Sequence, residues 1–574
     1  MPTTESLSDF IDRPDTAAAL FRYSGYSREF VEARPYIRLG KRMTGNYIIG
    51  YVQRDRLPEI LADIGASNMG IHPLLCGLFG EAELEAAGIL AVHRQVGLNL
   101  RGQGVVLGFI DTGIDYTLEA FRHADGTTRV LSIWDQTIKG DGPAPVDPPN
   151  SFGFGTEFGE ARINEALRAD NPKAVLPHTD EVGHGTFLAS VAGGNGAGGV
   201  IGAAPDAEFL VVKLKPATPF YMNFYQVPPN TPNIYESSDV MLGIEYILNR
   251  AIALGRPAAI CISVGTNLGA HNGSNILEEY MTRISYVPGV AICAAAGNES
   301  AARHHAQGII QSAGDSAVID LRTGSSGQGF VVCLWNNDTD RFSVSLRSPA
   351  GEIVTRIPAR SGTVYESSLV LERSTVRGQY HFPVDGSGGQ LTMISFIHPA
   401  AGVWHINVFG EIVLDGAYHA WLPITGMVDP EAEFMSPSPG FTVCVPATAM
   451  GVITCGAYDS VNNSLYPASS WGPTRLPSVS PDLTAPGVAV QGLFPFGAGR
   501  MSGTSVAAAI TAGAAALMLE WGVVQNNDPA MNTYLVRANL IRGCDRDSGL
   551  SYPNMQWGYG RLNLLRTFQL LRGV

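Results

Sequence analysis

Short, almost wholly apolar strands alternate with helical segments between residues 104 and 295. A strand with apolar residues on both faces fits a parallel sheet that helices cover on both sides. Helices are predicted between the strands, the longest over Asp239–Leu254. We therefore predict an α/β fold built on a doubly wound, mostly parallel sheet. Its strands are predicted at Gly104–Ile110, Ala207–Lys213, Ala258–Val264 and Val290–Ala295.

The pattern changes after about residue 308. Apolar and polar residues alternate over residues 342–346 and 404–408, and short strand-like runs recur between turns rich in Gly, Pro and Asp. Alternation with a period of two is typical of strands with one buried face, and no helical period falls among them. Because the α/β pattern resumes at Cys444, residues 308–430 are predicted to be an inserted antiparallel β domain of the jelly-roll type.

The chain ahead of the first α/β strand is predicted to form a small α+β unit. The predicted elements are a strand at Asn46–Val52, a helix at Leu57–Ile64, an extended segment at Gly70–Leu78 and a helix at Glu81–Ala87 that ends at Gly88. These changes of pattern define the predicted domains. They are the N-terminal unit (1–78), the α/β domain in two parts (79–307 and 431–574) and the insertion (308–430).

Ser505 opens a helix of small and apolar residues. From Val506 to Leu519 the sequence has no charged residue and no proline, which predicts a buried helix. A serine at a helix N-terminus lies among backbone N–H groups and the positive end of the helix dipole, where a developing oxyanion is stabilised. Small-residue helices are also common in protein cores, so Ser505 needs a partner base before it predicts catalysis.

Two further residues stand where α/β proteins place their chemistry. Asp111 follows the strand Gly104–Ile110, at the edge of a parallel sheet where ligands bind. His184 stands between two glycines, which allow another backbone or a substrate to approach closely. Singly, Asp111 fits a turn and His184 a structural histidine. Together with Ser505 they predict a catalytic triad, in which His184 is the base for Ser505 and Asp111 fixes the imidazole.

Composition argues against several other classes of protein. The net charge of −14 and the lack of a long Lys/Arg cluster argue against a nucleic-acid partner. The apolar run after Ser505 is too short for a membrane span, and the acidic N-terminus does not fit a secretory signal. The seven cysteines lie mostly in apolar runs, which favours buried free thiols. His178 and Asp180 lack a third ligand at a useful spacing, so we expect no metal and no cofactor.

The motifs around these residues resemble those of the subtilisin-like serine proteases, the subtilase or S8 family. An α/β-hydrolase is disfavoured, because the serine lies in G-T-S-V rather than G-x-S-x-G. The resemblance covers about residues 100–305 and 440–565. The matching segments are FIDTGID around Asp111, GHGTFLASVAGG around His184, SVG at Ser263–Gly265, AAAGN ending at Asn298, TAPG at Thr484–Gly487 and GTSVAAA around Ser505.

The resemblance implies roles for further residues. Asn298 would donate its side-chain amide to the oxyanion, beside the Ser505 N–H. Phe187 replaces a second histidine that many subtilases carry, at a position outside the triad. The segments that would bind the substrate residue before the scissile bond comprise Ser263, Val264, Gly265, Ala295, Ala296 and Gly297.

The predicted architecture is similar to one branch of this family, the Csp germination proteases of spore-forming Clostridia. By this resemblance the N-terminal unit is a prodomain, a chaperone and inhibitor whose tail at Pro73–Leu78 lies in the active-site cleft. We predict self-cleavage between about Leu75 and Glu81. The implied partners are the bound prodomain and a protein substrate, the proenzyme of a cortex-lytic hydrolase. The implied location is bacterial, in the spore or the cytoplasm.

Two other functions remain open. Some members of the Csp branch are pseudoproteases, so one alternative is a catalytically silent scaffold that regulates germination. The other is a general degradative subtilase. Because Asp111, His184, Asn298 and Ser505 are all present, the sequence favours a working serine endopeptidase.

Overall fold

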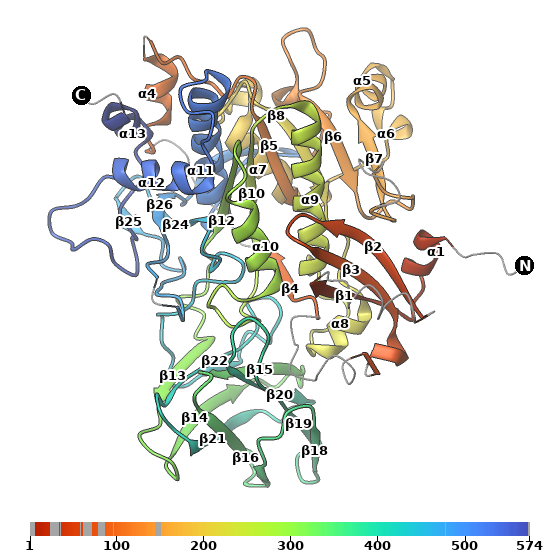
Figure 1. Ribbon diagram of the computed structural model, residues 1–574, viewed down its shortest axis with the longest axis vertical. Helices are drawn as coiled ribbons and strands as arrows, with labels where there is room; N and C mark the ends of the chain where they lie inside the picture. Colours follow the sequence, from red (N-terminus) through yellow and green to blue (C-terminus); the bar gives the residue numbers. More distant parts are fainter. Residues whose placement is uncertain are drawn as a thin grey trace, which may run out of the picture.

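A mostly parallel sheet forms the centre of the protein, with helices on both faces (Figure 1). The computed structural model describes residues 6–22, 34, 36–57, 59–60, 72–78, 86–95, 97–143, 151–476 and 478–571. Nine strands join in the order β25-β24-β12-β10-β5-β8-β6-β7, with β26 beside β24. All neighbours are parallel except β25 and β7, which pair antiparallel. The bounds are β5 Val106–Asp111, β6 Val130–Asp135, β7 Thr156–Gly159, β8 Glu208–Lys213, β10 Ala258–Ile262, β12 Val290–Ala295, β24 Ile453–Asp459, β25 Ser464–Leu465 and β26 Leu483–Pro486.

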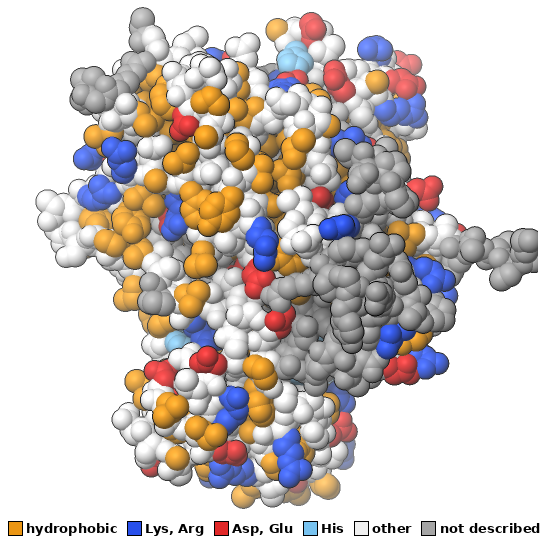
Figure 2. Space-filling view, viewed as in Figure 1, with side chains coloured by type: hydrophobic (Ala, Val, Ile, Leu, Met, Phe, Trp, Pro, Cys, Tyr) orange, Lys and Arg blue, Asp and Glu red, His pale blue; other side chains and the backbone are white. Residues whose placement is uncertain are grey.

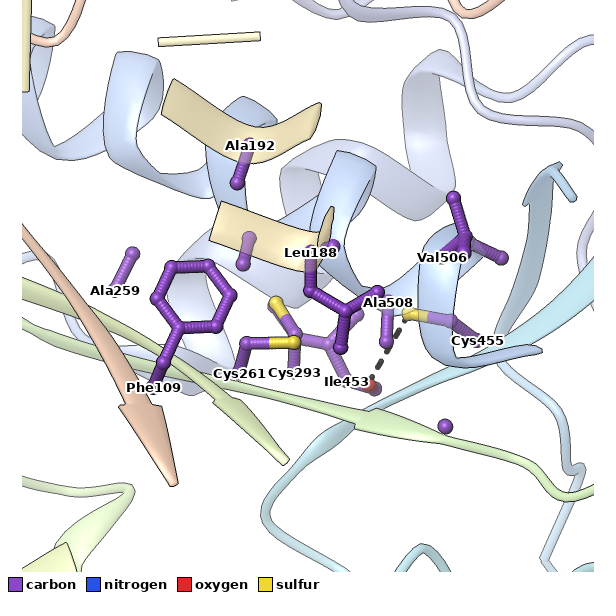
Figure 3. Close-up of a cluster of buried hydrophobic side chains, with 14 of the residues drawn as sticks. Phe109, Leu188, Ala192, Ala259, Cys261, Cys293, Ile453, Cys455, Val506 and Ala508 are labelled. Atoms are coloured by element: carbon purple, nitrogen blue, oxygen red, sulfur yellow. Dashed lines mark hydrogen bonds between the residues drawn. The ribbon is translucent and has the colours of Figure 1, made fainter. Parts of the chain in front are cut away.

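Alternate residues of the central strands face opposite layers of helices. On one face, Leu107 and Phe109 of β5 share an apolar cluster with α7 and α11 (Figure 3). On the other face, Val106 and Ile110 share a cluster with α9 and α10. The doubly wound α/β fold predicted from the sequence is thereby confirmed. These helices span α7 His184–Gly193, α9 Ser237–Leu254, α10 Ile276–Ile284 and α11 Thr504–Leu519.

Helix α11 runs through the core beside β10 and β12. All its residues are buried, and a π-helical turn at Glu520–Val524 continues it. Within the described residues, Thr504–Val524 is the one helical stretch long and apolar enough to cross a membrane, and 89% of its apolar window is buried inside the protein. The stretch is longer than the apolar run suggested, and its apolar side chains form the core of the α/β domain.

Strands β13 to β23 include two antiparallel sheets, at the bottom of Figure 1. Their orders are β13-β22-β15-β20-β19-β18 and β17-β16-β21-β14-β23. Val332 and Leu334 of one sheet meet Ile406 and Val408 of the other in a separate apolar core. The antiparallel β insertion is thus confirmed. Its strands are β13 His305–Ile309, β14 Ser316–Thr323, β15 Phe330–Asn336, β16 Arg341–Arg347, β17 Ile353–Ile357, β18 Val364–Leu369, β19 Ser374–His381, β20 Gln390–Ile397, β21 Gly402–Ile412, β22 Ala417–Trp421 and β23 Glu433–Phe434.

A small antiparallel sheet near the N-terminus packs on α9 and α10. Thr44 N–H donates to Glu245 of α9 at 3.1 Å, and the Tyr47 hydroxyl donates to Glu279 near the start of α10 at 3.1 Å. The predicted strand Asn46–Val52 is present as β3, whereas the predicted helices Leu57–Ile64 and Glu81–Ala87 lie partly outside the described residues. The sheet consists of β1 Thr16–Arg22, β3 Tyr47–Gln53 and β2 Ile37–Met43, in that order.

The surface carries charges of both signs. Figure 2 shows Lys and Arg side chains interspersed with Asp and Glu over the described part of one face. This mixture accompanies a net charge of −14 over the whole chain. Interspersed charges do not generate the single-sign field with which a protein steers a charged polymer.

Stacked rings join the insertion to the α/β domain. Trp421 of β22 stacks on His271 of the α/β domain, with ring centroids 4.2 Å apart. His305 of β13 stacks on the same indole at 4.8 Å, and its Nε2 lies 3.1 Å from Nδ1 of His419. Burial lowers the pKa of His305 to about 3, and burial with the adjacent His305 lowers the pKa of His419 to about 2. Both imidazoles are therefore neutral in the folded protein at pH 7.

We expect acid to weaken folding through His305 and His419. Their folded-state pKa values lie below the ordinary value of about 6.5, so the unfolded chain binds more protons. The stability present above pH 6.5 is therefore lost as the pH falls, toward 3 for His305 and toward 2 for His419, by up to about 1.4 kcal/mol per pH unit for each histidine.

Urea denaturation between about pH 5 and 7 measures this slope, in a Ser505→Ala background that lacks the predicted nucleophile. The added substitution His305→Gln removes one titrating group and is expected to flatten the slope. Equal slopes with and without His305 would contradict the expectation.

Candidate active site

Ser505 lies in the first turn of α11. Its side chain is fully buried, and Oγ donates to the carbonyl oxygen of Ser263 at 3.4 Å. The first backbone N–H groups of a helix lack helical acceptors, so this turn presents donors beside the hydroxyl. Because α11 is held on all sides by the core, packing fixes the position of Ser505.

Asp111 and His184 are in direct contact. Asp111 ends β5, and His184 begins α7. The His184 Nδ1 lies 2.8 Å from Oδ1 and 2.9 Å from Oδ2 of Asp111, and both side chains are buried. This contact fixes the imidazole ring by its Nδ1 side. The structure thus brings together two of the three predicted triad residues by a hydrogen-bonded pair.

Further donors surround the Asp111 carboxylate. The Thr112 N–H donates to Oδ1 at 2.7 Å, and the Ser263 hydroxyl donates to Oδ2. Burial opposes ionisation of Asp111, but the charge and hydrogen bond of His184 and the bond from Ser263 outweigh it and lower the pKa of Asp111. Asp111 is therefore ionised at neutral pH. Sequence reasoning missed this role of the Ser263 hydroxyl, because it assigned Ser263 to substrate binding alone.

Glycine is required at position 185, directly after His184. A Cβ at Gly185 would lie 2.3 Å from the Gly113 carbonyl oxygen and 3.2 Å from Asp111 Cβ, so only glycine lets α7 approach the end of β5 this closely. The Gly185 N–H then donates to Thr112 Oγ1 at 3.0 Å. The glycine motif around His184 therefore has a packing cause.

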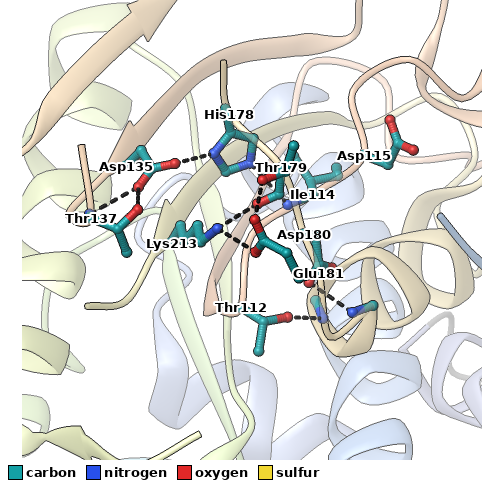
Figure 4. Close-up of polar contacts among 12 residues, drawn as sticks. Thr112, Ile114, Asp115, Asp135, Thr137, His178, Thr179, Asp180, Glu181 and Lys213 are labelled. Atoms are coloured by element: carbon teal, nitrogen blue, oxygen red, sulfur yellow. Dashed lines mark hydrogen bonds and ion pairs between the residues drawn. The ribbon is translucent and has the colours of Figure 1, made fainter. Parts of the chain in front are cut away.

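A polar network fixes the loop ahead of α7 (Figure 4). His178 Nδ1 lies 2.6 Å from Asp135 Oδ2, and His178 Nε2 accepts from the Ile114 N–H at 3.2 Å. Asp180 accepts from the Gly183 N–H at 2.8 Å and from the N–H and hydroxyl of Thr186. His178 and Asp180 are candidate metal ligands in the sequence alone. In the structure, their ring nitrogens and carboxylate oxygens form hydrogen bonds that position the first turn of α7.

Asn298 lies beside the start of α11. Its Oδ1 accepts from the Thr504 N–H at 3.2 Å and from the Thr504 hydroxyl at 3.1 Å. Thr504 Oγ1 in turn accepts from the Gly297 N–H at 3.0 Å. The amide oxygen of Asn298 is therefore held by Thr504, the residue next to Ser505, which turns Nδ2 away from these donors. The orienting role of Thr504 is a second contact that sequence reasoning missed.

A strand from the N-terminal unit pairs with the segment that follows Ser263. Strand β4 (Leu75–Leu78) pairs antiparallel with β11 (Val264–Gly265) on one side and with β9 (Tyr235–Glu236) on the other. Val264 lies opposite Leu78, and Gly265 opposite Gly77. Of the predicted self-cleavage window Leu75–Glu81, residues 79–81 lie outside the described residues.

The other predicted substrate-binding residues lie at the end of β12. Ala295 is its last residue, and Ala296 and Gly297 follow it in buried positions. A Cβ at Gly297, whose φ is +105°, would lie 2.4 Å from the Cys444 sulfur. This segment is thus packed tightly between Cys444 and Thr504 of α11. Its contact with substrate stays a prediction.

A mostly parallel sheet with Asp111 at a strand end, and His184 and Ser505 in the first turns of two helices, defines the class of subtilisin-like folds. The sequence profile of the Subtilase family (Peptidase_S8) matches residues 102–320 and 435–560, more than half of the chain. The chain belongs to this family. The matched ranges leave out most of the insertion.

Among solved structures, the chain is similar to the CspB protease of Clostridium perfringens. The identity is 31%, the match covers 85% of this chain and 96% of that chain, and the TM-score is 0.74. The match covers more of this chain than the two ranges of the family profile, so it extends beyond the α/β domain that the profile describes. The predicted resemblance to the Csp branch is confirmed at the level of the fold.

Two curated proteins are similar over less of their length. The membrane-bound transcription factor site-1 protease of Mus musculus is 36% identical over 133 residues, which are 22% of this chain and 12% of that protein. The PI-type proteinase of Lactococcus lactis subsp. cremoris is 24% identical over 480 residues, which are 75% of this chain and 23% of that protein. The chain therefore matches less than a quarter of either protein.

The Ser263 hydroxyl is expected to matter for activity through Asp111. In Ser263→Ala the carboxylate loses a donor, the pKa of Asp111 rises toward its ordinary value, and kcat/KM falls roughly tenfold or more, as for a hydrogen bond to a charged group. The backbone carbonyl of Ser263 is retained, so KM is expected to change little.

A pH profile of kcat/KM with a peptide substrate measures this effect, and the acid limb is expected to move to higher pH. Ser300→Ala is the matched control, because it removes a hydroxyl bond to the Pro467 carbonyl away from the triad. An unaltered profile in Ser263→Ala would exclude the positioning role.

Proposed function

We propose that this protein is a serine endopeptidase whose triad is Asp111, His184 and Ser505. Since His184 Nδ1 faces Asp111, Nε2 is the nitrogen that takes the proton of Ser505. The Ser505 oxygen attacks the peptide carbonyl, and His184 passes the proton to the leaving amine. Water, deprotonated by His184 in the same way, then hydrolyses the acyl-enzyme.

Asn298 is proposed to stabilise the oxyanion. With Oδ1 engaged by Thr504, its Nδ2 is the donor left for the substrate oxygen, beside the N–H of Ser505. A preorganised donor of this kind contributes about 3–4 kcal/mol to transition-state stabilisation. The fixed amide orientation supports a working enzyme over a catalytically silent scaffold.

The place of β4 is the single observation that carries the proposal. An extended segment antiparallel to β11 is how a protein substrate would lie, with Gly77 opposite Gly265 and Leu78 opposite Val264. In this register the next substrate residue faces Ser263, whose carbonyl accepts from Ser505 Oγ. The bond that fits this register is the one after Phe79, inside the window predicted from the sequence. We propose that the protein cleaves itself there.

Self-cleavage is expected in the wild-type protein and not in Ser505→Ala, because the variant lacks the nucleophile. N-terminal sequencing of purified protein is expected to find a new terminus at Gly80 in the wild type and an uncleaved chain in the variant. A fluorophosphonate probe is expected to label the wild type alone. Ser464→Ala, in the short edge strand β25, is the control for loss of a hydroxyl. An intact wild-type chain that takes up no probe would overturn the proposal and favour the silent scaffold.

We further propose that the physiological substrate is the proenzyme of a cortex-lytic hydrolase in germinating spores. The support is the similarity to the CspB protease of Clostridium perfringens, which covers 85% of this chain and 96% of that chain. An enzyme with this role acts inside the spore, next to its stored substrate. A general degradative subtilase would instead be released and would act on many proteins.

Spores that carry Ser505→Ala in place of the native residue are expected to accumulate the uncleaved proenzyme and to lose most of their cortex hydrolysis after germinant is added. Immunoblots of spore extracts measure the first effect and released muramic acid the second. Spores that carry Ser464→Ala control for the genetic change. Normal proenzyme cleavage in Ser505→Ala spores, with the protein found in the culture medium, would favour the degradative alternative.

A further inference from the structure

The insertion presents an apolar sheet face to the α/β domain. In the pairing of β15 with β20, Cys333 lies opposite Met393 and Trp335 opposite Leu391. These side chains are buried in the same apolar cluster as the α/β domain, whereas their even-numbered neighbours form the core of the insertion. One sheet of the insertion is therefore covered on both faces, and its outer face belongs to the α/β domain.

A cavity lies where this sheet face meets the loop after β11. Its volume is about 40 Å³, enough for two or three water molecules. The Tyr225 hydroxyl and Trp335 Nε1 are buried without a hydrogen-bond partner among the described residues. The lining residues that the argument uses are Leu74, Tyr225, Leu268, Gly269, Trp335 and Met393.

Leu74 lines this cavity and directly precedes β4, the strand that lies where we propose a substrate binds. Its N–H donates to the Ser237 hydroxyl at 2.8 Å, and its carbonyl accepts from the Ser237 N–H at 2.7 Å. The chain then continues directly into β4, which lies antiparallel to β11. Leu74 is the sixth residue on the N-terminal side of the proposed scissile bond, if Phe79 is counted as the first. A protein substrate bound in the same register would have the sixth residue before its scissile bond at this cavity.

The space around the Leu74 side chain accommodates a side chain of leucine size or larger. A Cβ at Gly269, whose φ is +135°, would lie 3.4 Å from Leu74 Cδ1 and 3.0 Å from Val445 Cγ2. A larger residue at position 269 would therefore reduce the space that the Leu74 side chain occupies. Leu74 is 6% exposed, and the remaining cavity beside it is lined mostly by apolar residues. The space around Leu74 thus fits leucine, and the adjoining cavity leaves room for a longer apolar side chain.

We propose that this cavity is a substrate subsite shared by the α/β domain and the insertion. It takes a leucine-sized or longer apolar side chain, such as leucine or methionine, six residues before the scissile bond of a protein substrate. Met393 and Trp335 of the insertion form its outer wall, so the insertion takes part in substrate selection. This inference rests on the proposed endopeptidase function and adds a specificity-determining position to it.

The test uses fluorogenic peptides and the purified, self-processed protein. Long peptides copy residues 72–84 with Leu, Met, Ala or Asp at the position of Leu74, and a short peptide copies residues 76–84. The Leu and Met peptides are expected to have a kcat/KM about 10-fold to 100-fold above the Ala and Asp peptides, the range for burial of one apolar side chain. The short peptide is expected to match the Ala peptide.

Enzyme variants assign the preference to the insertion. Met393→Ala is expected to lower kcat/KM for the Leu peptide at least about fivefold more than for the Ala peptide, because the outer wall is lost. Leu371→Ser, at a position of the insertion that is 74% exposed, is the matched control and is expected to keep the preference. If Met393→Ala lowered kcat/KM for the Leu peptide and for the Ala peptide by the same factor, the insertion would be excluded from the subsite.

Self-cleavage gives a second readout within the whole chain. Leu74→Asp is expected to slow self-cleavage about tenfold or more, and Leu74→Met is expected to leave its rate close to that of wild type. Cleavage of all long peptides at one rate, or self-cleavage unaffected by Leu74→Asp, would overturn the subsite. Failure of the endopeptidase proposal is distinct from both: no peptide of either length is cleaved, and Ser505 takes up no fluorophosphonate.

Discussion

The buried charge of Asp111 is the interaction on which the rest of the site depends. An ionised carboxylate removed from water costs several kcal/mol unless donors surround it. Here the donors come from the adjoining turn through Thr112, from α7 through His184, and from the segment after β10 through Ser263. Each donor fixes the position of its own element. The hydrogen bonds that stabilise the charge therefore also hold β5, α7 and the segment Ser263–Gly265 in their mutual arrangement.

The insertion separates Asn298 from Ser505 in the sequence without separating them in space. It begins with β13 and ends with β23. Strand β13 pairs antiparallel with β22, with His305 opposite Trp421, and the Phe434 N–H of β23 donates to the Arg303 carbonyl at 3.0 Å. The two ends of the insertion are thus neighbours, as in a short loop. Lengthening a loop whose ends already meet costs little further entropy. Thr504 can therefore bind Asn298 as closely as in a chain without the insertion.

Much of the fold and of the candidate site was predictable because the informative patterns are local. Apolar strands such as Val290–Ala295 and the residues at their ends are contiguous in sequence, and each motif around Asp111, His184 and Ser505 fits within a few residues. Strand β9, at Tyr235–Glu236, was not predictable, since it has two residues in a polar, Pro-rich region and owes its form to pairing with β4. The Ser263 bond to Asp111 depends on the register of two distant strands, which no local pattern specifies.

The two sheets of the insertion differ in a way that the sequence does record. Strand β16 alternates buried residues with partly buried or exposed ones toward its end, whereas every residue of β15, Phe330–Asn336, is buried. A strand that is apolar on both faces needs a second covering layer. In a free-standing sandwich the outer face of β15 would leave Trp335 and Cys333 in water as an apolar patch, which soluble proteins rarely expose. The lack of alternation in β15 therefore marks the sheet that docks on the α/β domain, and the insertion shares an apolar core with that domain instead of standing apart from it.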